Sequence, residues 1–305
     1  MIEALVSEEL LRGAAAGVVG LMVVLGAGII QRSRHRRPPP LVGVVLAVAV
    51  IVGMRDRVPT GVVAAVVLLA GAGLVADVWG RARLVVPLLA LPGALALAGE
   101  STLAGGPPWL PWLVVGAVIL GGPLMGSFDD RWRAHGYGPV LIAATAAGIY
   151  ATVPDTEGAL VVLGAAAVLA WAGWPWPLAG LGWAGSLAVT GVIVWSASSD
   201  GLDRPASIVG GVACFGLLWV EPLVRSALRR RGSPFEGYPG AMAPLLAAVA
   251  VHAAVVVVAS RGAGLRLDAL SAAVISGGAL LLAFAFVAVL STAPSETDGY
   301  PAPGG

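Results

Sequence analysis

Long apolar runs, interrupted by short clusters of Arg, Asp, Pro and Gly, follow one another along almost the whole chain. A hydrocarbon core of about 30 Å is crossed by about 20 apolar residues in a helix, because each residue adds about 1.5 Å. The runs therefore predict an all-α fold, a polytopic membrane helix bundle with about 10–11 transmembrane helices. The helices are expected at residues 11–31, 41–54, 60–77, 84–99, 109–126, 138–153, 158–173, 184–198, 206–227, 243–260 and 269–291.

Composition narrows the class of protein further. Hydrophobic residues make up 58% of the chain and charged residues 11%, whereas soluble domains carry about 25% charged residues. The formal charge of +1 comes with scattered cations, so nucleic-acid binding is excluded as a function. We expect one transmembrane domain at 1–291 and a disordered cytoplasmic tail at 292–305, which is rich in Pro and Gly.

The distribution of Arg predicts the orientation in the membrane. Loops on the cytoplasmic side carry the excess of cations. One side of the predicted bundle collects twelve Arg, at positions 32, 34, 36, 37, 81, 83, 131, 133, 225, 229, 230 and 231, and the other side holds the remaining six of the 18. The N-terminus is therefore expected outside and the C-terminus in the cytoplasm, in a multi-pass protein of the inner (cytoplasmic) membrane.

Ionisable residues gather at the predicted cytoplasmic face. Such residues are costly inside a bilayer and are usually functional there. His252 alone falls in the middle of a predicted span, where a hydrogen-bonded neutral side chain is the simpler interpretation. The cytoplasmic side carries His35, Asp77, Asp129, Asp130, His135, Glu221 and Glu236. A site would open to the cytoplasm, and the alternative is that these charges only solvate helix ends and anchor lipid.

Five polar segments occur in an order that resembles one family of membrane enzymes. The first loop, residues 32–44, reads RSRHRRPPPLVGV, and residues 73–83, at the end of the third predicted helix, read GLVADVWGRAR. Residues 125–136, after the fifth predicted helix, read MGSFDDRWRAHG, and residues 180–195 read GLGWAGSLAVTGVIVW. Residues 217–240 read LLWVEPLVRSALRRRGSPFEGYPG. Together these segments are similar to those of the polyprenyl-phosphate N-acetylhexosamine-1-phosphate transferases, glycosyltransferase family 4.

The resemblance implies a cytoplasmic site and a set of residues in it. Proteins of this family move a sugar phosphate from a UDP-sugar to polyprenyl phosphate with Mg²⁺, in cell-envelope polysaccharide synthesis. If the chain is active, the resemblance implies Asp77, Asp129 and Asp130 as catalytic residues, with Asp77 and Asp130 as metal ligands. The substrate-binding residues that it implies are Arg34, His35, Ser186, Arg229, Arg230, Arg231 and Glu236.

Three departures from the family pattern fall in this same inferred site. Ala76 stands where the family has the first Asp of an Asp-Asp pair, and Trp183 stands where it has the Asp of Gly-Asp-Ala-Gly-Ser. The loop that carries His-x-His-His in the family reads Glu-Gly-Tyr-Pro-Gly at 236–240. Mg²⁺ prefers carboxylate, phosphate and water oxygens, and an indole supplies none of these.

The departures leave three functions open. The first is a catalytically impaired member, a pseudoenzyme without cofactor that keeps lipid-phosphate binding or serves as a partner of an envelope-biosynthesis enzyme. The second is an active Mg²⁺-dependent transferase with a rebuilt acidic site, acting on a UDP-sugar and polyprenyl phosphate. The third is an unrelated transporter, against which the lack of charged pairs and repeats within the spans argues.

Overall fold

The structure, a computed structural model, consists of helices packed side by side. It describes residues 8–32, 41–54, 58–79, 84–103, 108–132, 142, 157–172 and 180–199, together with positions 278, 281 and 285. This part of the chain contains no strand, so the all-α prediction is confirmed for it.

The helices observed match seven of the predicted segments. They are α1 (Glu8–Arg32), α2 (Val42–Gly53), α3 (Thr60–Val78), α4 (Val86–Leu103), α5 (Leu110–Trp132), α7 (Glu157–Leu169), followed by the short 3₁₀ helix η4 (Ala170–Ala172), and α8 (Gly182–Ser199). The predicted helices at 138–153, 206–227, 243–260 and 269–291, and the tail at 292–305, lie outside the described residues apart from single positions.

Helix α5 extends further than the sequence predicted. The apolar run suggested an end near residue 126, but the helix continues to Trp132 through the polar segment that contains Asp129. Asp129 therefore lies on a helix and not in the loop after it. Its carboxylate is buried and accepts hydrogen bonds from the start of another helix, so α5 can continue through this polar residue.

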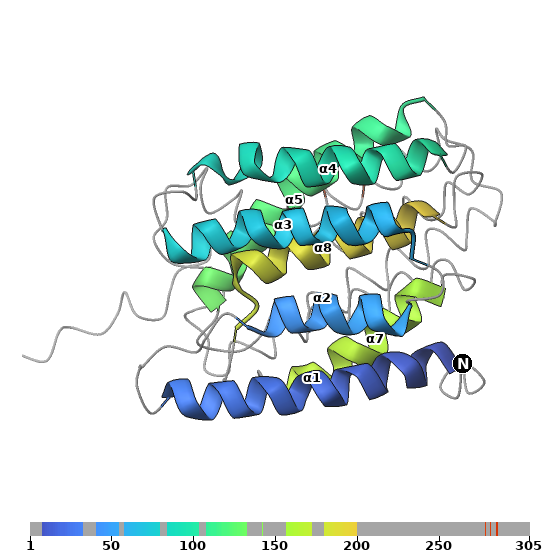
Figure 1. The fold of residues 1–305 in the computed structure, drawn as a ribbon. Helices are drawn as coiled ribbons and strands as arrows, with labels where there is room; N and C mark the ends of the chain where they lie inside the picture. Colours follow the sequence, from blue (N-terminus) through green and yellow to red (C-terminus); the bar gives the residue numbers. More distant parts are fainter. Residues whose placement is uncertain are drawn as a thin grey trace, which may run out of the picture.

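Helices α1 to α5 run in alternating directions, and α7 and α8 are antiparallel to one another (Figure 1). Contacts of glycine residues show the relative direction of the helices. Gly122 of α5 faces Leu187 of α8, while Gly126, further along α5, faces Trp183 at the beginning of α8. Helices α5 and α8 are therefore antiparallel. Gly61 of α3 lies against Glu100 of α4, and Gly93 of α4 lies against Leu69 of α3, so α3 and α4 are antiparallel as well. The C-terminal ends of α1, α3, α5 and α7 thus share one end of the bundle with the N-terminal ends of α2, α4 and α8, as expected for successive crossings.

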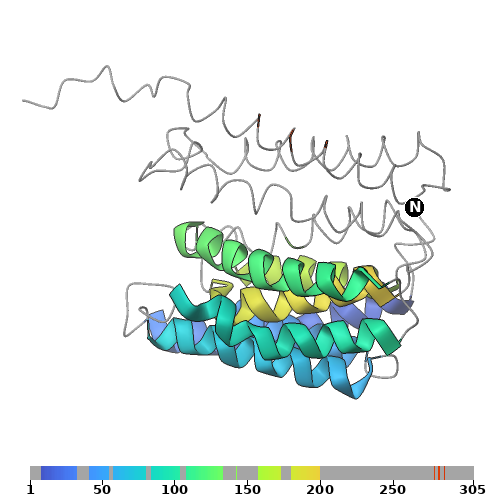
Figure 2. The same ribbon diagram turned by 90° about the horizontal axis from the view of Figure 1, so that it is seen from above.

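Helix α8 is the centre of the described bundle. Every residue from 180 to 195 is buried. Helices α3 and α5 make the largest contacts with it, and α2 packs on it as well. Figure 2 shows the described helices as a layered block around α8. Close packing relies on small residues, as is common between membrane helices: Gly13 and Gly17 of α1 pack on the backbone of α7.

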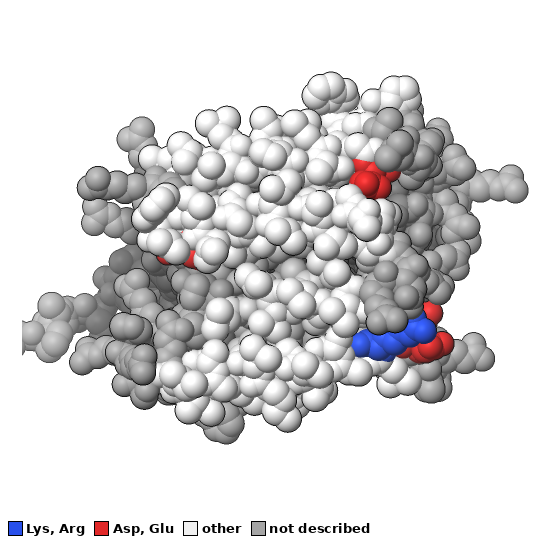
Figure 3. Space-filling view, in the orientation of Figure 1, with Lys and Arg blue, Asp and Glu red and all other residues white. Residues whose placement is uncertain are grey.

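Three helical segments are long and apolar enough to cross a membrane: Glu8–Ala27, Thr60–Val78 and Leu110–Asp129. Four shorter apolar helices accompany them in the described part of the chain. Figure 3 shows that the coloured charges on this face lie toward the two ends of the helices, with an uncharged surface between them. These features indicate a membrane protein.

Candidate functional site

Four of the five segments that carry the family resemblance meet at the beginning of α8. The chain reaches this point with Gly182 in the left-handed region, at a φ of 75°, a conformation that glycine adopts without strain. The residue before it is Leu181, which has no side-chain acceptor for the first N–H groups of the helix. Since an uncapped helix end buried in a bundle is costly, these N–H groups need acceptors from elsewhere.

Asp129 of α5 supplies two of these acceptors. The N–H of Leu181 donates to its Oδ1 at 3.0 Å, and the N–H of Gly182 donates to its Oδ2 at 2.9 Å. Asp129 is only 3% exposed. Both carboxylate oxygens thus accept charge-assisted hydrogen bonds in a buried setting, where such bonds are strong.

Asp77, in the last turn of α3, supplies two more acceptors. The N–H of Trp183 donates to its Oδ1 at 3.1 Å, and the N–H of Ala184 donates to its Oδ2 at 3.0 Å. Four consecutive N–H groups are therefore bound by two carboxylates from two different helices. We call Asp77, Asp129 and these N–H groups of residues 181–184 the α8 cap.

The start of α2 is joined to the same segment. Helix α2 has no side-chain cap of its own, and the N–H groups of Val42 and Gly43 donate to the carbonyl oxygens of Gly180 and Leu181 at 3.0 and 3.2 Å. Gly43 lies directly against Gly185, backbone to backbone. The segment before α8 therefore accepts hydrogen bonds from α2 while it donates to α3 and α5, which connects the ends of four helices.

The Trp183 side chain fills the space beside the α8 cap. It is 6% exposed, and its indole lies over Gly126 of α5, where an added Cβ would be 2.9 Å from the ring. On the other side, Gly73 of α3 lies against the backbone of Trp183 and Ala184. Because glycines on two neighbouring helices accommodate this residue, the indole is part of the packed core.

The hydroxyl groups of Ser186 and Thr190 in α8 are satisfied within the bundle. Ser186 donates to the carbonyl of Gly182, and Thr190 donates to the carbonyl of Ser186, each at 2.7 Å. Both side chains are fully buried. Such bonds to the preceding turn are an ordinary way to place a hydroxyl in an apolar helix. Ser186, implied as a substrate-binding residue, thus has its hydroxyl directed at the backbone of its own helix.

Helix dipoles explain why both carboxylates are stable at this place. Each Asp lies near the C-terminal end of its own helix, where the negative end of the dipole disfavours an anion. The N-terminal end of α8 carries the opposite partial charge and points its N–H groups at both carboxylates. The favourable interaction of each carboxylate with the N-terminal end of α8 thus offsets its unfavourable interaction with the dipole of its own helix.

The described residues do not fit a magnesium ion at this point. Each oxygen of Asp77 and of Asp129 accepts one backbone N–H group, and the positive end of the α8 dipole at these carboxylates disfavours a cation beside them. No group of three His, Cys, Asp or Glu side chains in the described ranges is placed to hold a metal. Trp183 presents an aromatic ring there and no oxygen ligand.

The predicted site residues are brought together only in part. Asp77, Asp129, Trp183 and Ser186 lie at or next to the α8 cap, and Ala76 is buried in the core of α3. Asp130 belongs to α5, but its side chain is outside the described residues, as are Arg34, His35, Arg229, Arg230, Arg231 and Glu236.

The capping role of the two carboxylates and the glycines that surround Trp183 are not predicted from the sequence. One signal was available in the sequence. Leu41 and Leu181 precede α2 and α8 at positions where Ser, Thr, Asp or Asn usually caps a helix. Two buried helices without a local cap require acceptors from other parts of the chain, and Asp residues at the ends of neighbouring helices can provide them.

We expect Gly126→Ala to destabilise the protein by about 1–2 kcal/mol, because the new methyl group overpacks the buried indole of Trp183. The matched control is Gly116→Ala in the same helix, where an added Cβ meets no atom within 4 Å. Equilibrium unfolding in detergent micelles, followed by helical circular dichroism, measures both. Equal stability of the two variants would show that the indole does not occupy this position.

Comparisons of the chain with family models, with curated proteins and with solved structures find no match.

Proposed function

We propose that the chain is a multi-pass protein of the inner membrane, built on the scaffold of the polyprenyl-phosphate N-acetylhexosamine-1-phosphate transferases. In this proposal it has its N-terminus outside and its C-terminus in the cytoplasm, and it takes part in envelope polysaccharide synthesis by binding and not by turnover. It binds lipid phosphate through its basic loops, or it acts as the partner of an envelope-biosynthesis enzyme.

One observation carries the proposal: the carboxylates of Asp77 and Asp129 each accept two backbone N–H groups of α8. A metal-dependent transferase needs carboxylate oxygens free to hold a cation that neutralises the diphosphate. Here the same oxygens have a structural task. Together with Trp183 in the core, this favours a protein that keeps the shape of the reaction site without its metal chemistry.

The position of the resembling segments supports the relationship to the family. Residues 41–43, 73–77, 126–129 and 182–186 are far apart in sequence and meet around the start of α8. A shared reaction site requires such a convergence, because the groups that act on one substrate must lie together.

The same convergence favours the second candidate, an active Mg²⁺-dependent transferase with a rebuilt acidic site. Two carboxylates are held near one another at the end of the bundle that we predict to be cytoplasmic. In that case Asp130 would supply an additional ligand, and the basic loop residues would hold the substrates.

A turnover assay distinguishes these two candidates. The purified protein is incubated with UDP-N-acetylhexosamines, polyprenyl phosphate and Mg²⁺, and the release of UMP and the lipid product are followed by mass spectrometry. We expect no product above the level without protein. Mg²⁺-dependent release of UMP that EDTA abolishes and that Asp77→Asn removes, without loss of helical circular dichroism, would overturn the proposal.

Binding of lipid phosphate gives the positive test. We expect Arg230→Gln to weaken the binding of polyprenyl phosphate by about 1 kcal/mol, or about fivefold in Kd, because one guanidinium at an anionic surface contributes about that much. Titration of the lipid in detergent micelles measures the Kd. Arg12→Gln, at the end of the bundle opposite to the α8 cap, is the control and should leave the Kd unchanged. Equal effects of the two substitutions would contradict a specific cytoplasmic site.

A further inference from the structure

The exposed tryptophans of the described helices lie at the two ends of the bundle. Trp79 follows α3 and is 67% exposed, and Trp171 follows α7 and is 71% exposed. Trp109 and Trp112 lie at the beginning of α5, with 44% and 74% exposed. Because α3, α5 and α7 run in the same direction, the first pair marks one end of the bundle and the second pair marks the opposite end.

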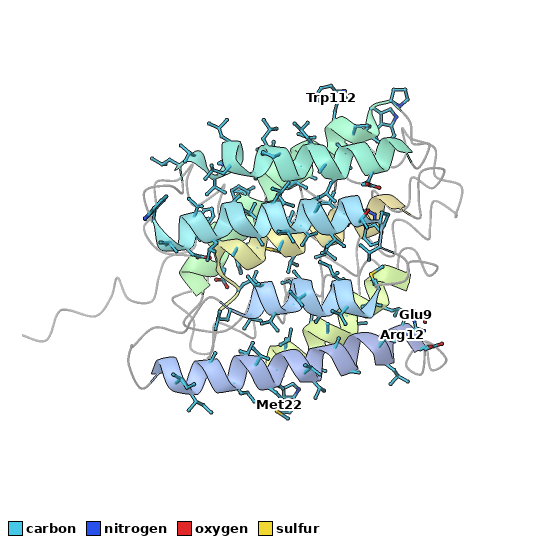
Figure 4. All side chains as sticks on the ribbon, in the orientation of Figure 1. Glu9, Arg12, Met22 and Trp112 are labelled. Carbon is cyan, nitrogen blue, oxygen red and sulfur yellow. The ribbon has the colours of Figure 1, made fainter. Side chains whose placement is uncertain are left out.

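The surface between these ends is apolar. Large exposed side chains cover it on several helices, including Val19, Met22, Val67, Leu68, Leu91 and Leu95, which we call the apolar belt. Figure 4 shows Met22 on α1 and Trp112 on the opposite side of the bundle, both pointing outward, with Glu9 and Arg12 at one end of α1. Every charged side chain that the described part of the chain exposes lies near a helix end.

The spacing of the two ends agrees with the thickness of a bilayer. From Thr60 to Trp79 the chain rises by about 28 Å at about 1.5 Å per residue, close to the hydrocarbon thickness of about 30 Å. Tryptophan prefers the boundary between headgroups and hydrocarbon, because its ring is apolar and its N–H needs a polar partner. Large exposed apolar side chains on α1, α3 and α4 mark a surface of the kind that contacts a membrane or another protein.

The geometry points to a lipid-facing girdle: the apolar belt contacts the acyl chains of a phospholipid bilayer, and the two tryptophan pairs lie at its opposite interfaces. The partner is the bilayer itself and not a second copy of the chain. This inference rests on the membrane placement in the proposed function, and it is independent of whether the protein turns over a substrate.

Spin-label accessibility tests the girdle position by position. In a Cys214→Ser background each introduced cysteine is the only thiol of the chain. Nitroxide-labelled Val19→Cys, Val67→Cys and Leu95→Cys sample the middle of the apolar belt, Trp79→Cys and Trp112→Cys sample its two edges, and Glu8→Cys is the control in water. The full-length protein is placed in vesicles of dioleoyl phosphatidylcholine and phosphatidylglycerol, and collisions with oxygen and with a water-soluble nickel chelate are measured.

If the apolar belt faces lipid, the labelled positions should show collision frequencies that contact with water or with a second copy of the chain would not produce. At the three middle positions, oxygen collisions should exceed nickel collisions several-fold, the reverse should hold at Glu8→Cys, and the two edge positions should be intermediate. Nickel access at the middle positions would overturn the inference, and so would low access to both reagents, which indicates contact with a second copy. Turnover in the transferase assay would instead overturn the proposed function and leave these readings unchanged.

Discussion

Asp129→Ala is expected to lower the free energy of unfolding by about 4 kcal/mol. The substitution removes two hydrogen bonds to a buried carboxylate, and bonds of this type contribute about 1.5–3 kcal/mol each. It also leaves the N–H groups of Leu181 and Gly182 without that acceptor in a setting that excludes water. Equilibrium unfolding in mixed micelles of mild detergent and dodecyl sulfate measures the difference.

Two further variants test whether the loss of stability comes from the α8 cap and not from the removal of a negative charge in general. Asp129→Asn retains one acceptor oxygen and turns an NH₂ group toward the second N–H, so we expect an intermediate loss of stability. Glu8→Gln breaks the exposed pair with Arg12 on the surface of α1 and should change stability by less than about 0.5 kcal/mol. If Asp129→Ala were no more harmful than Glu8→Gln, the α8 cap would not be the connection that holds α5 to α8.

Gly43→Ala is expected to cost about 3 kcal/mol, the upper end of the usual cost of overpacking. The methyl group would be directed at the Gly185 backbone, which is continuous with α8 and has no flexible side chain that can move aside. Separating the helices would also lengthen the bonds from Val42 and Gly43 to the segment before α8. The same unfolding measurement provides the test.

The matched control for this prediction is Gly71→Ala on the exposed face of α3, where an added Cβ meets no atom within 4 Å. It should stabilise the protein by about 0.5–1 kcal/mol, because alanine is the better helix former. The double variant Gly43→Ala and Gly185→Ala should cost less than the sum of the single changes, since both disturb one contact. A Gly43→Ala variant as stable as Gly71→Ala would contradict the close crossing of α2 and α8.

The α8 cap changes how the acidic residues of this chain are interpreted. The family resemblance implies Asp77 and Asp129 as catalytic residues, and Asp77 also as a metal ligand. The geometry gives each of them two backbone donors. A carboxylate at the end of a buried helix is therefore not by itself a sign of catalysis, because a neighbouring helix without a local cap needs the same group.

Trp183, which stands where the family that the chain resembles has an acidic residue, is consistent with this structural role. A third carboxylate beside Asp77 and Asp129 would add repulsion unless a cation were bound between them. The indole instead fills the space over Gly126 and contributes apolar burial. Under the proposed function, the protein keeps the convergence of four helix ends and stabilises it by hydrogen bonds and packing in place of a metal.

The positions of the helices could be predicted from the sequence because of a simple physical constraint. A run of apolar residues long enough to cross a bilayer must form a helix, since every backbone N–H and C=O needs a partner within the segment. Polar residues mark the ends, which is why the predicted and observed ranges of α2 and α3 differ by only a residue or so. The end of α5 was wrong because its polar residues are buried by α8 and do not face water.

The sequence by itself thus determined that the described part of the chain is helical, with three helices capable of crossing a membrane, and it located the polar residues that gather at the helix ends. Only the tertiary structure decided what those residues do. Whether a carboxylate binds a metal or caps a helix depends on which donors lie within about 3 Å of it. The donors to Asp77 lie more than a hundred residues away along the chain, and the donors to Asp129 lie more than fifty residues away. A local sequence pattern does not predict contacts over such separations.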